Sequence, residues 1–277
     1  MQALQLPSGQ MIPVLGMGTW KMGENARNRQ TEIAALRHGL DLGLSLIDTA
    51  EMYGEGGAEE VIAQAIAHRR SEVFLVSKVY PHNALKKAAI AACERSLKRL
   101  QTDYLDLYLL HWRGSAHLSE TLDAFQTLQQ AGKIRSYGVS NFDIEDMQEV
   151  MQLGGGNTIA TNQVLYNLMR RGIELDLLPW CRQQKLPIMA YSPLEQGKLL
   201  NHQALKVIAQ ERRITTAQVA IAWLLHQDNV IVIPKSSHMK HVEENRAALD
   251  LKLSLEELAT LDAALPPPTQ PVPLEML

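Results

Sequence analysis

The chain has few cysteines and lacks several features that mark common classes of protein. Its 277 residues include only Cys93 and Cys181, so no disulfide framework is expected and both should be free thiols. No apolar run reaches the roughly 18 residues that a membrane-spanning helix needs. The first residues have neither a basic start nor a long apolar run, so no signal peptide is expected. We therefore expect a soluble protein of the reducing cytoplasm, with no membrane partner.

An excess of charge of one sign is also missing. The 27 basic and 30 acidic residues give a formal net charge of −3. The densest basic stretch, CERSLKRL at 93–100, fits the solvated face of a helix, so no nucleic-acid partner is expected. The histidines at 68, 82, 111, 117 and 226 lack ligand-like spacing, so no metal site is expected.

What the sequence does contain is an alternation of short apolar runs with helical patterns. Eight runs read as strands, at 14–18, 44–48, 73–78, 105–111, 134–140, 159–163, 187–192 and 230–235. Helical spacing of apolar residues falls between most of them, at 31–42, 58–67, 120–131, 143–152 and 216–226. Asp143 is a good N-cap, and Ser254 with Glu257 forms a capping box before a last helix.

Eight strands joined by crossover helices predict a (β/α)8 TIM barrel that forms a single domain over residues 1–277. The alternative is an open, doubly wound sheet, which usually has G-x-G-x-x-G after its first strand. The stretch GMGTWK at 16–21 lacks the third glycine. The turn signal Ser8-Gly9 predicts an N-terminal β-hairpin at the barrel floor, and the proline-rich tail is expected to be irregular.

Four residues capable of proton chemistry lie on or just after three adjacent predicted strands. Asp48, Lys78 and His111 each end an apolar run, and Tyr53 follows Asp48 by five residues. Alone, Asp48 reads as a helix cap and His111 as a core histidine, so the interpretation depends on the combination. Because the C-terminal strand ends of a barrel meet at one mouth, these side chains should converge.

The combination predicts a device that delivers a proton. A phenol has a pKa of about 10, and a nearby ammonium favours the phenolate and lowers that value. We therefore expect Lys78 to acidify Tyr53, Asp48 to hold Lys78 charged, and His111 to orient a carbonyl. Tyr53 would then protonate the carbonyl oxygen while a nucleophile reaches the carbon.

These residues occur within longer motifs that resemble the aldo-keto reductase superfamily along nearly the whole chain. The motifs are GMGTWKMG (16–23), LSLIDTAEMYGEGGAEEVIAQAI (44–66), VFLVSKV (73–79), SLKRLQTDYLDLYLLHW (96–112), GKIRSYGVSNF (132–142), TNQVLYN (161–167), AYSPL (190–194) and VIPKSSHMKHVEEN (232–245). The resemblance implies an NADP-dependent reductase with Asp48, Tyr53, Lys78 and His111 as its catalytic tetrad. The pattern is most similar to bacterial members that reduce small aldehydes such as methylglyoxal.

The resemblance also implies which residues bind the cofactor, NADPH. Ser140, Asn141 and Gln163 would hold the nicotinamide carboxamide, and Tyr191 would stack on its ring. Thr19 and Trp20 would lie near the ribose, with Asp48 beside them, and Ser192 and Leu194 along the pyrophosphate. Lys235, Ser236 and Ser237 would meet a phosphate at the start of a helix, and Glu244 and Asn245 would approach the adenine. The chain departs from the family at His241, where many members have an arginine that grips the phosphate.

The substrate pocket is harder to predict. Trp20 and Trp112 should flank Tyr53 and His111 as an apolar wall. The short loop at 113–119 and the twelve residues after Leu265 imply an open pocket that accepts small carbonyls. We expect a monomer. Two other functions stay open from the sequence: an aldolase that forms a Schiff base on Lys78, and a non-catalytic NADPH-binding regulatory subunit.

Overall fold

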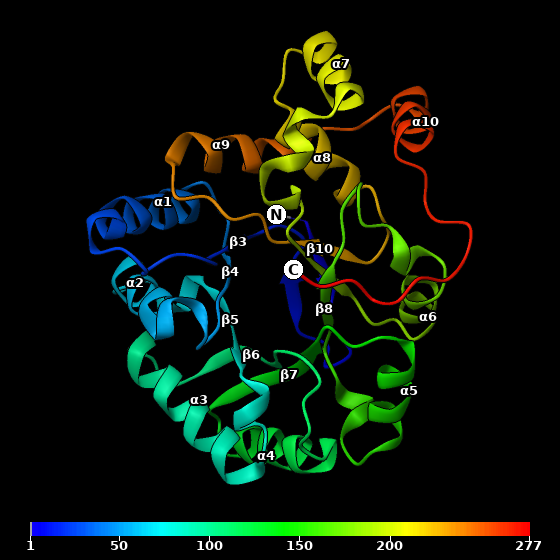
Figure 1. The fold of residues 1–277 in the computed structure, drawn as a ribbon. Helices are drawn as coiled ribbons and strands as arrows, with labels where there is room; N and C mark the ends of the chain where they lie inside the picture. Colours follow the sequence, from blue (N-terminus) through cyan, green and yellow to red (C-terminus); the bar gives the residue numbers. More distant parts are fainter. Residues whose placement is uncertain (1) are drawn as a thin grey trace.

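Residues 2–277, described here from a computed structural model, form a parallel β-barrel surrounded by helices (Figure 1). The barrel strands are β3 (Gly16–Gly18), β4 (Leu46–Asp48), β5 (Phe74–Val79), β6 (Leu105–Leu110), β7 (Ile134–Ser140), β8 (Asn162–Leu165), β9 (Ile188–Tyr191) and β10 (Val230–Val232). They pair in chain order from β3 to β10, and every pairing is parallel. The (β/α)8 barrel predicted from the sequence is therefore confirmed.

The barrel closes between its first and last strands. Isolated parallel bridges join Leu15 to Val232 and Gly18 to Lys235. Main-chain hydrogen bonds reinforce them, from Val232 N to Val14 O at 2.8 Å and from Gly18 N to Pro234 O at 3.0 Å. Closure removes the free edges of the eight-stranded sheet and brings its first and last strands together at the mouth.

The predicted hairpin also forms and lies at the barrel floor. Strands β1 (Ala3–Gln5) and β2 (Met11–Pro13) pair antiparallel. Buried Leu6 and Ile12 pack into the barrel interior, against a cluster that includes Leu46, Val76 and Leu107. The floor is thus filled by side chains, so ligands can enter only at the opposite mouth.

Helices cover the outside of the barrel in the expected alternation. They are α1 (Arg29–Asp41), α2 (Gly57–Ala65), α3 (Lys86–Leu100), α4 (Leu118–Gln130), α5 (Ile144–Gln152), α6 (Leu177–Gln183), α7 (Gln203–Arg212), α8 (Thr216–Leu225), α9 (Met239–Ala247) and α10 (Leu255–Ala264). Asp143 caps α5, and the capping box of Ser254 and Glu257 starts α10, as predicted. Within residues 2–277, no helix has the length and apolar character to cross a membrane.

Some predicted boundaries were wrong. The strand predicted at 159–163 begins only at Asn162, because Gly156–Thr158 forms a 3-10 turn that Ile159 closes. The last strand ends at Val232 rather than at 235, since Pro234 has no N–H to donate to the ladder. Lys235 and Ser236 do not open a helix directly, because α9 starts at Met239 with His238 as its N-cap.

Candidate active site

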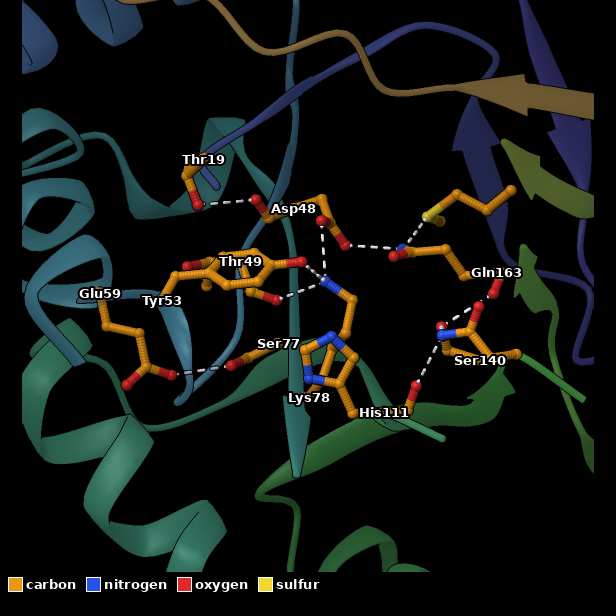
Figure 2. Close-up of polar contacts among 12 residues, drawn as sticks. Thr19, Asp48, Thr49, Tyr53, Glu59, Ser77, Lys78, His111, Ser140 and Gln163 are labelled. Atoms are coloured by element: carbon orange, nitrogen blue, oxygen red, sulfur yellow. Dashed lines mark hydrogen bonds and ion pairs between the residues drawn. The ribbon is translucent and has the colours of Figure 1, made fainter. Parts of the chain in front are cut away.

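The four predicted catalytic side chains converge at the C-terminal mouth of the barrel, on and beside β4, β5 and β6 (Figure 2). The Lys78 Nζ atom donates to Asp48 Oδ2 at 2.8 Å, to Thr49 O at 2.9 Å and to the Tyr53 hydroxyl at 3.2 Å. Lys78 is fully buried, so its ammonium is held in one place by these three oxygens. The ring of His111 meets that of Tyr53 edge-on, with centroids 5.7 Å apart.

Glycines explain how the loops around Tyr53 pack so closely. Gly23 has a φ of +75°, and a Cβ there would lie 2.2 Å from the carbonyl carbon of Gly57. Only hydrogen fits at that contact, which holds the loop after β3 against the start of α2. The glycine-rich segment after Tyr53 therefore packs against the loop that contains Trp20 and holds that loop next to Tyr53.

The electrostatics differ from the sequence prediction in one respect. Burial raises the pKa of Tyr53 above its ordinary value, and the Lys78 ammonium lowers it by less. The net direction is upward, so the predicted acidification of the free phenol was wrong. Tyr53 therefore stays protonated at physiological pH, which is the form that can donate. Lys78 limits the rise and stands ready to stabilise the phenolate that remains after proton transfer.

Lys78 and His111 have definite charge states. Burial lowers the pKa of Lys78, but Asp48 and Tyr53 raise it by more, so the amine stays protonated. Burial lowers the pKa of His111 to about 2, helped by the charge of Lys78. The imidazole is thus neutral at physiological pH and keeps one N–H and one acceptor nitrogen. It can orient a carbonyl, but it is not a charged acid.

A second polar network surrounds the tetrad. Gln163, on β8, donates from Nε2 to Asp48 Oδ1 at 2.8 Å, and the Ser140 hydroxyl donates to Gln163 O at 2.8 Å. Asn141 Nδ2 donates to His111 O at 3.1 Å, and the Tyr191 hydroxyl donates to Asn141 Oδ1 at 3.0 Å. Asn141 has a φ of +57°, a left-handed conformation that asparagine tolerates better than most residues. Amides and hydroxyls are therefore fixed beside the tetrad.

One cavity of about 690 Å³ contains almost all of the predicted site residues. Its walls include Trp20, Tyr53 and Trp112 as well as Lys235 and His241. The other predicted residues on its walls are Thr19, Asp48, His111, Ser140, Asn141, Gln163, Tyr191, Ser192, Leu194, Ser236, Glu244 and Asn245. Two predicted residues do not line it: Lys78 lies beneath the wall, bonded to Asp48 and Tyr53, and Ser237 lies outside the lining.

Sequence reasoning missed several wall residues. Thr215, Thr216 and Ala217 line the cavity at the start of α8, where Thr215 and Gln218 form a capping box. That capping box is a signal that could have been read. Met276 and Leu277 also line the cavity, although the tail is irregular as predicted. The short tail thus reaches the mouth and forms part of the wall. The open pocket expected from the short loops stays a prediction.

A barrel with this tetrad at its mouth can be compared with known proteins. A model described as "Aldo/keto reductase family" matches residues 14–266. The chain belongs to the aldo/keto reductase family. It is therefore an oxidoreductase, and the Schiff-base aldolase and regulatory-subunit interpretations are not supported.

Individual reductases resemble the chain over most or nearly all of its length. "Methylglyoxal reductase YeaE" of Escherichia coli is 54% identical and covers 99% of this chain and 98% of its own. "Glyoxal reductase" of Bacillus subtilis is 34% identical, over 94% of this chain and 91% of its own. A crystal structure of an aldo/keto reductase from Klebsiella pneumoniae, in complex with NADP and acetate, has a TM-score of 0.97 and 53% identity, covering 99% of both chains.

Proposed function

We propose that this enzyme reduces small aldehydes and ketoaldehydes, methylglyoxal among them, with NADPH as hydride donor and Tyr53 as proton donor. The observation that supports it best is the Tyr53 hydroxyl on a cavity wall, 3.2 Å from an ammonium that Asp48 holds at 2.8 Å. The names of similar reductases support the substrate class, and the NADP complex of the Klebsiella enzyme supports the cofactor.

The donor groups of the cavity fit a dinucleotide. At one end lie fixed amides and a hydroxyl, suited to a carboxamide, beside the aromatic face of Tyr191. At the other end lie Lys235 and His241, suited to a phosphate. We assign the carboxamide to Ser140, Asn141 and Gln163, the ring to Tyr191, and the 2′-phosphate to Lys235, Ser236 and His241. Between these two groups, the ribose and pyrophosphate would contact Thr19, Trp20, Ser192 and Leu194. The adenine would contact Glu244 and Asn245.

The chemistry divides between cofactor and protein. When bound, the reduced nicotinamide supplies the hydride for the carbonyl carbon. The Tyr53 hydroxyl gives its proton to the carbonyl oxygen, so the products are an alcohol and oxidised cofactor. The phenolate left on Tyr53 is stabilised by the Lys78 ammonium, and neutral His111 donates one hydrogen bond to the carbonyl oxygen and so fixes the carbonyl. Trp20 and Trp112 exclude water from the reacting atoms.

A panel of carbonyl compounds tests the substrate class. With NADPH oxidation followed at 340 nm, we expect kcat/KM to be highest for methylglyoxal and other small aldehydes. The apolar wall near Tyr53 offers little to polyhydroxylated chains. A strict preference for steroids or long sugars would show that the proposed substrate class is wrong.

His241→Arg tests the phosphate assignment. A guanidinium can bind a phosphate through two parallel hydrogen bonds, which an imidazole cannot do. We expect kcat/KM for NADPH to rise by about threefold to tenfold, with little change for NADH, as a partly exposed charge-assisted contact would give. Lys240→Arg is the matched control, because Lys240 is the exposed neighbour on α9 and does not line the cavity. If the ratio of kcat/KM for NADPH to kcat/KM for NADH did not change, the assignment of His241 to the phosphate would be contradicted.

We further propose that residues 1–277 act as one domain and that the enzyme works as a cytoplasmic monomer without a nucleic-acid partner. The family match over 14–266 and the continuous barrel support a single domain. The near balance of 27 basic and 30 acidic residues argues against nucleic-acid binding.

A further inference from the structure

A second buried ion pair lies close to the tetrad but outside the cavity. Glu59, in the first turn of α2, is fully buried. Its Oε1 atom accepts a hydrogen bond from the Ser77 hydroxyl at 2.7 Å, and its Oε2 atom accepts one from Arg99 Nε at 2.6 Å. None of these three residues lines the cavity. Because a buried carboxylate is costly unless it is paired, both oxygens of Glu59 depend on these partners.

Ser77 connects this ion pair to Lys78. The two residues are consecutive on β5, so their side chains point to opposite faces of the sheet. Lys78 points into the barrel, where its Nζ atom meets the Tyr53 hydroxyl. Ser77 points outward to Glu59 on the neighbouring helix (Figure 2). Any shift of Ser77 along or across the sheet therefore moves Lys78 with it.

Arg99 connects the same ion pair to the turn that follows Tyr53. Residues 54–56 have φ values of +57°, +53° and +92°, so three left-handed residues follow one another. A turn of this kind persists only where its surroundings hold it. A Cβ at Gly56 would lie 2.5 Å from both Cδ and Nε of Arg99, so the Arg99 side chain lies directly against the turn. The Arg99 side chain thus supports the backbone next to Tyr53.

The Glu59 carboxylate therefore joins the two elements whose separation matters for proton transfer. One of its oxygens is bound to the strand that contains Lys78, and the other to the side chain that supports the turn after Tyr53. The Tyr53 hydroxyl and the Lys78 ammonium lie 3.2 Å apart. Since the attraction between an ammonium and a phenolate falls with distance, a small change in this separation weakens the stabilisation of the phenolate.

We propose that Glu59 is a positioning residue for proton transfer, which together with Ser77 and Arg99 fixes the distance between the Tyr53 hydroxyl and the Lys78 ammonium. This inference rests on the proposed reductase function. It gives a kinetic consequence to a contact outside the cavity. The step affected is the transfer of the proton, and the binding of cofactor and aldehyde is unaffected.

Ser77→Ala is the first test, and Ser96→Ala is its matched control. Both serines are fully buried, and Ser96 Oγ accepts a hydrogen bond from Arg99 Nη2 at 3.3 Å, but Ser96 lies on α3 and not beside Lys78. In Ser77→Ala we expect kcat for methylglyoxal to fall by about threefold to tenfold, the scale of one lost hydrogen bond, with KM and the Kd of NADPH within about twofold of the parent enzyme. Ser96→Ala should keep the kcat of the parent enzyme.

Replacement of Glu59 is the second test. In Glu59→Ala we expect kcat and kcat/KM to fall together by about tenfold to a hundredfold, the order that a misplacement of about 1 Å costs. The solvent isotope effect on kcat, measured in H₂O and D₂O, should rise because proton transfer becomes the slow step. Glu59→Gln keeps two polar atoms for Ser77 and Arg99, so it should regain most of the lost kcat.

Thermal unfolding followed by circular dichroism checks that each variant folds, and if Glu59→Ala does not fold, the two serine variants decide. The inference is overturned if Ser77→Ala and Glu59→Ala keep the kcat and solvent isotope effect of the parent enzyme. It is also overturned if Ser96→Ala loses as much kcat as Ser77→Ala, because the loss would then follow from general destabilisation. A parent enzyme that reduces no aldehyde would refute the proposed function and this inference together, whereas an active parent with unaffected variants refutes the inference alone.

Discussion

Replacement of Tyr53 by phenylalanine is expected to lower kcat for aldehyde reduction by roughly 10²–10⁴-fold, the usual contribution of a positioned general acid. The variant keeps the ring that meets His111 edge-on but loses the hydroxyl 3.2 Å from Lys78. The Kd of NADPH, measured by fluorescence titration, should stay unchanged, because the contacts assigned to the carboxamide, the nicotinamide ring and the 2′-phosphate come from other strands. Loss of turnover without loss of cofactor affinity places the defect in proton transfer.

Tyr104→Phe is the matched control for this experiment. Tyr104 precedes β6, at the opposite end of the barrel, where its ring lies between the guanidinium groups of Arg70 and Arg135. The activity of Tyr104→Phe should equal that of the parent enzyme. If Tyr53→Phe kept most of its turnover, another acid would be required, and His111 would be the first candidate.

The kcat of the parent enzyme should stay level from about pH 6 to 8, because the pKa of Tyr53 lies above this range and that of His111 below it.

Lys78→Met should damage both catalysis and folding. Without the ammonium, nothing offsets the burial that raises the pKa of Tyr53, and the phenolate formed during reduction loses its partner. We expect kcat to fall by roughly 10²–10⁴-fold. The buried Asp48 also loses its counter-charge, which typically costs about 3–5 kcal/mol in the free energy of unfolding. Urea denaturation and steady-state kinetics measure the two effects separately.

A double variant separates the two roles of Lys78. In Asp48→Asn with Lys78→Met the uncompensated buried charge is gone, so much of the lost stability should return while activity stays low. A double variant that recovered turnover would contradict the role of the ammonium. A single variant with unchanged stability would mean that Asp48 is not ionised beside Lys78.

The sequence predicted the barrel and the tetrad because both follow from local patterns. Apolar runs of fixed length identify strands, and a polar residue at the end of each run falls at the mouth of a parallel barrel. Asp48, Lys78 and His111 each end such a run, so their convergence could be foreseen. The caps at Asp143 and Ser254 were equally readable, since capping depends on residues only three apart.

Other features depend on contacts that no local pattern shows. Arg170 and Glu275 are 105 positions apart and lie outside any helix or strand, so nothing in the sequence predicts that they meet. The upward shift in the pKa of Tyr53 required its burial to be known, because the sequence suggests the neighbouring ammonium but not the desolvation. Helix α6 was not assigned, since it has only seven residues. Helix α7 was also missed, although Leu205, Ile208 and Ala209 are buried at helical spacing and form a pattern that could have been read.

The most direct measurement is a crystal structure of the enzyme with NADP⁺ and an unreactive carbonyl analogue. We predict that the nicotinamide lies on Tyr191 with its C4 atom near the Tyr53 hydroxyl, so that one carbonyl group reaches both. A nicotinamide bound elsewhere, or a Tyr53 hydroxyl turned away from C4, would contradict it.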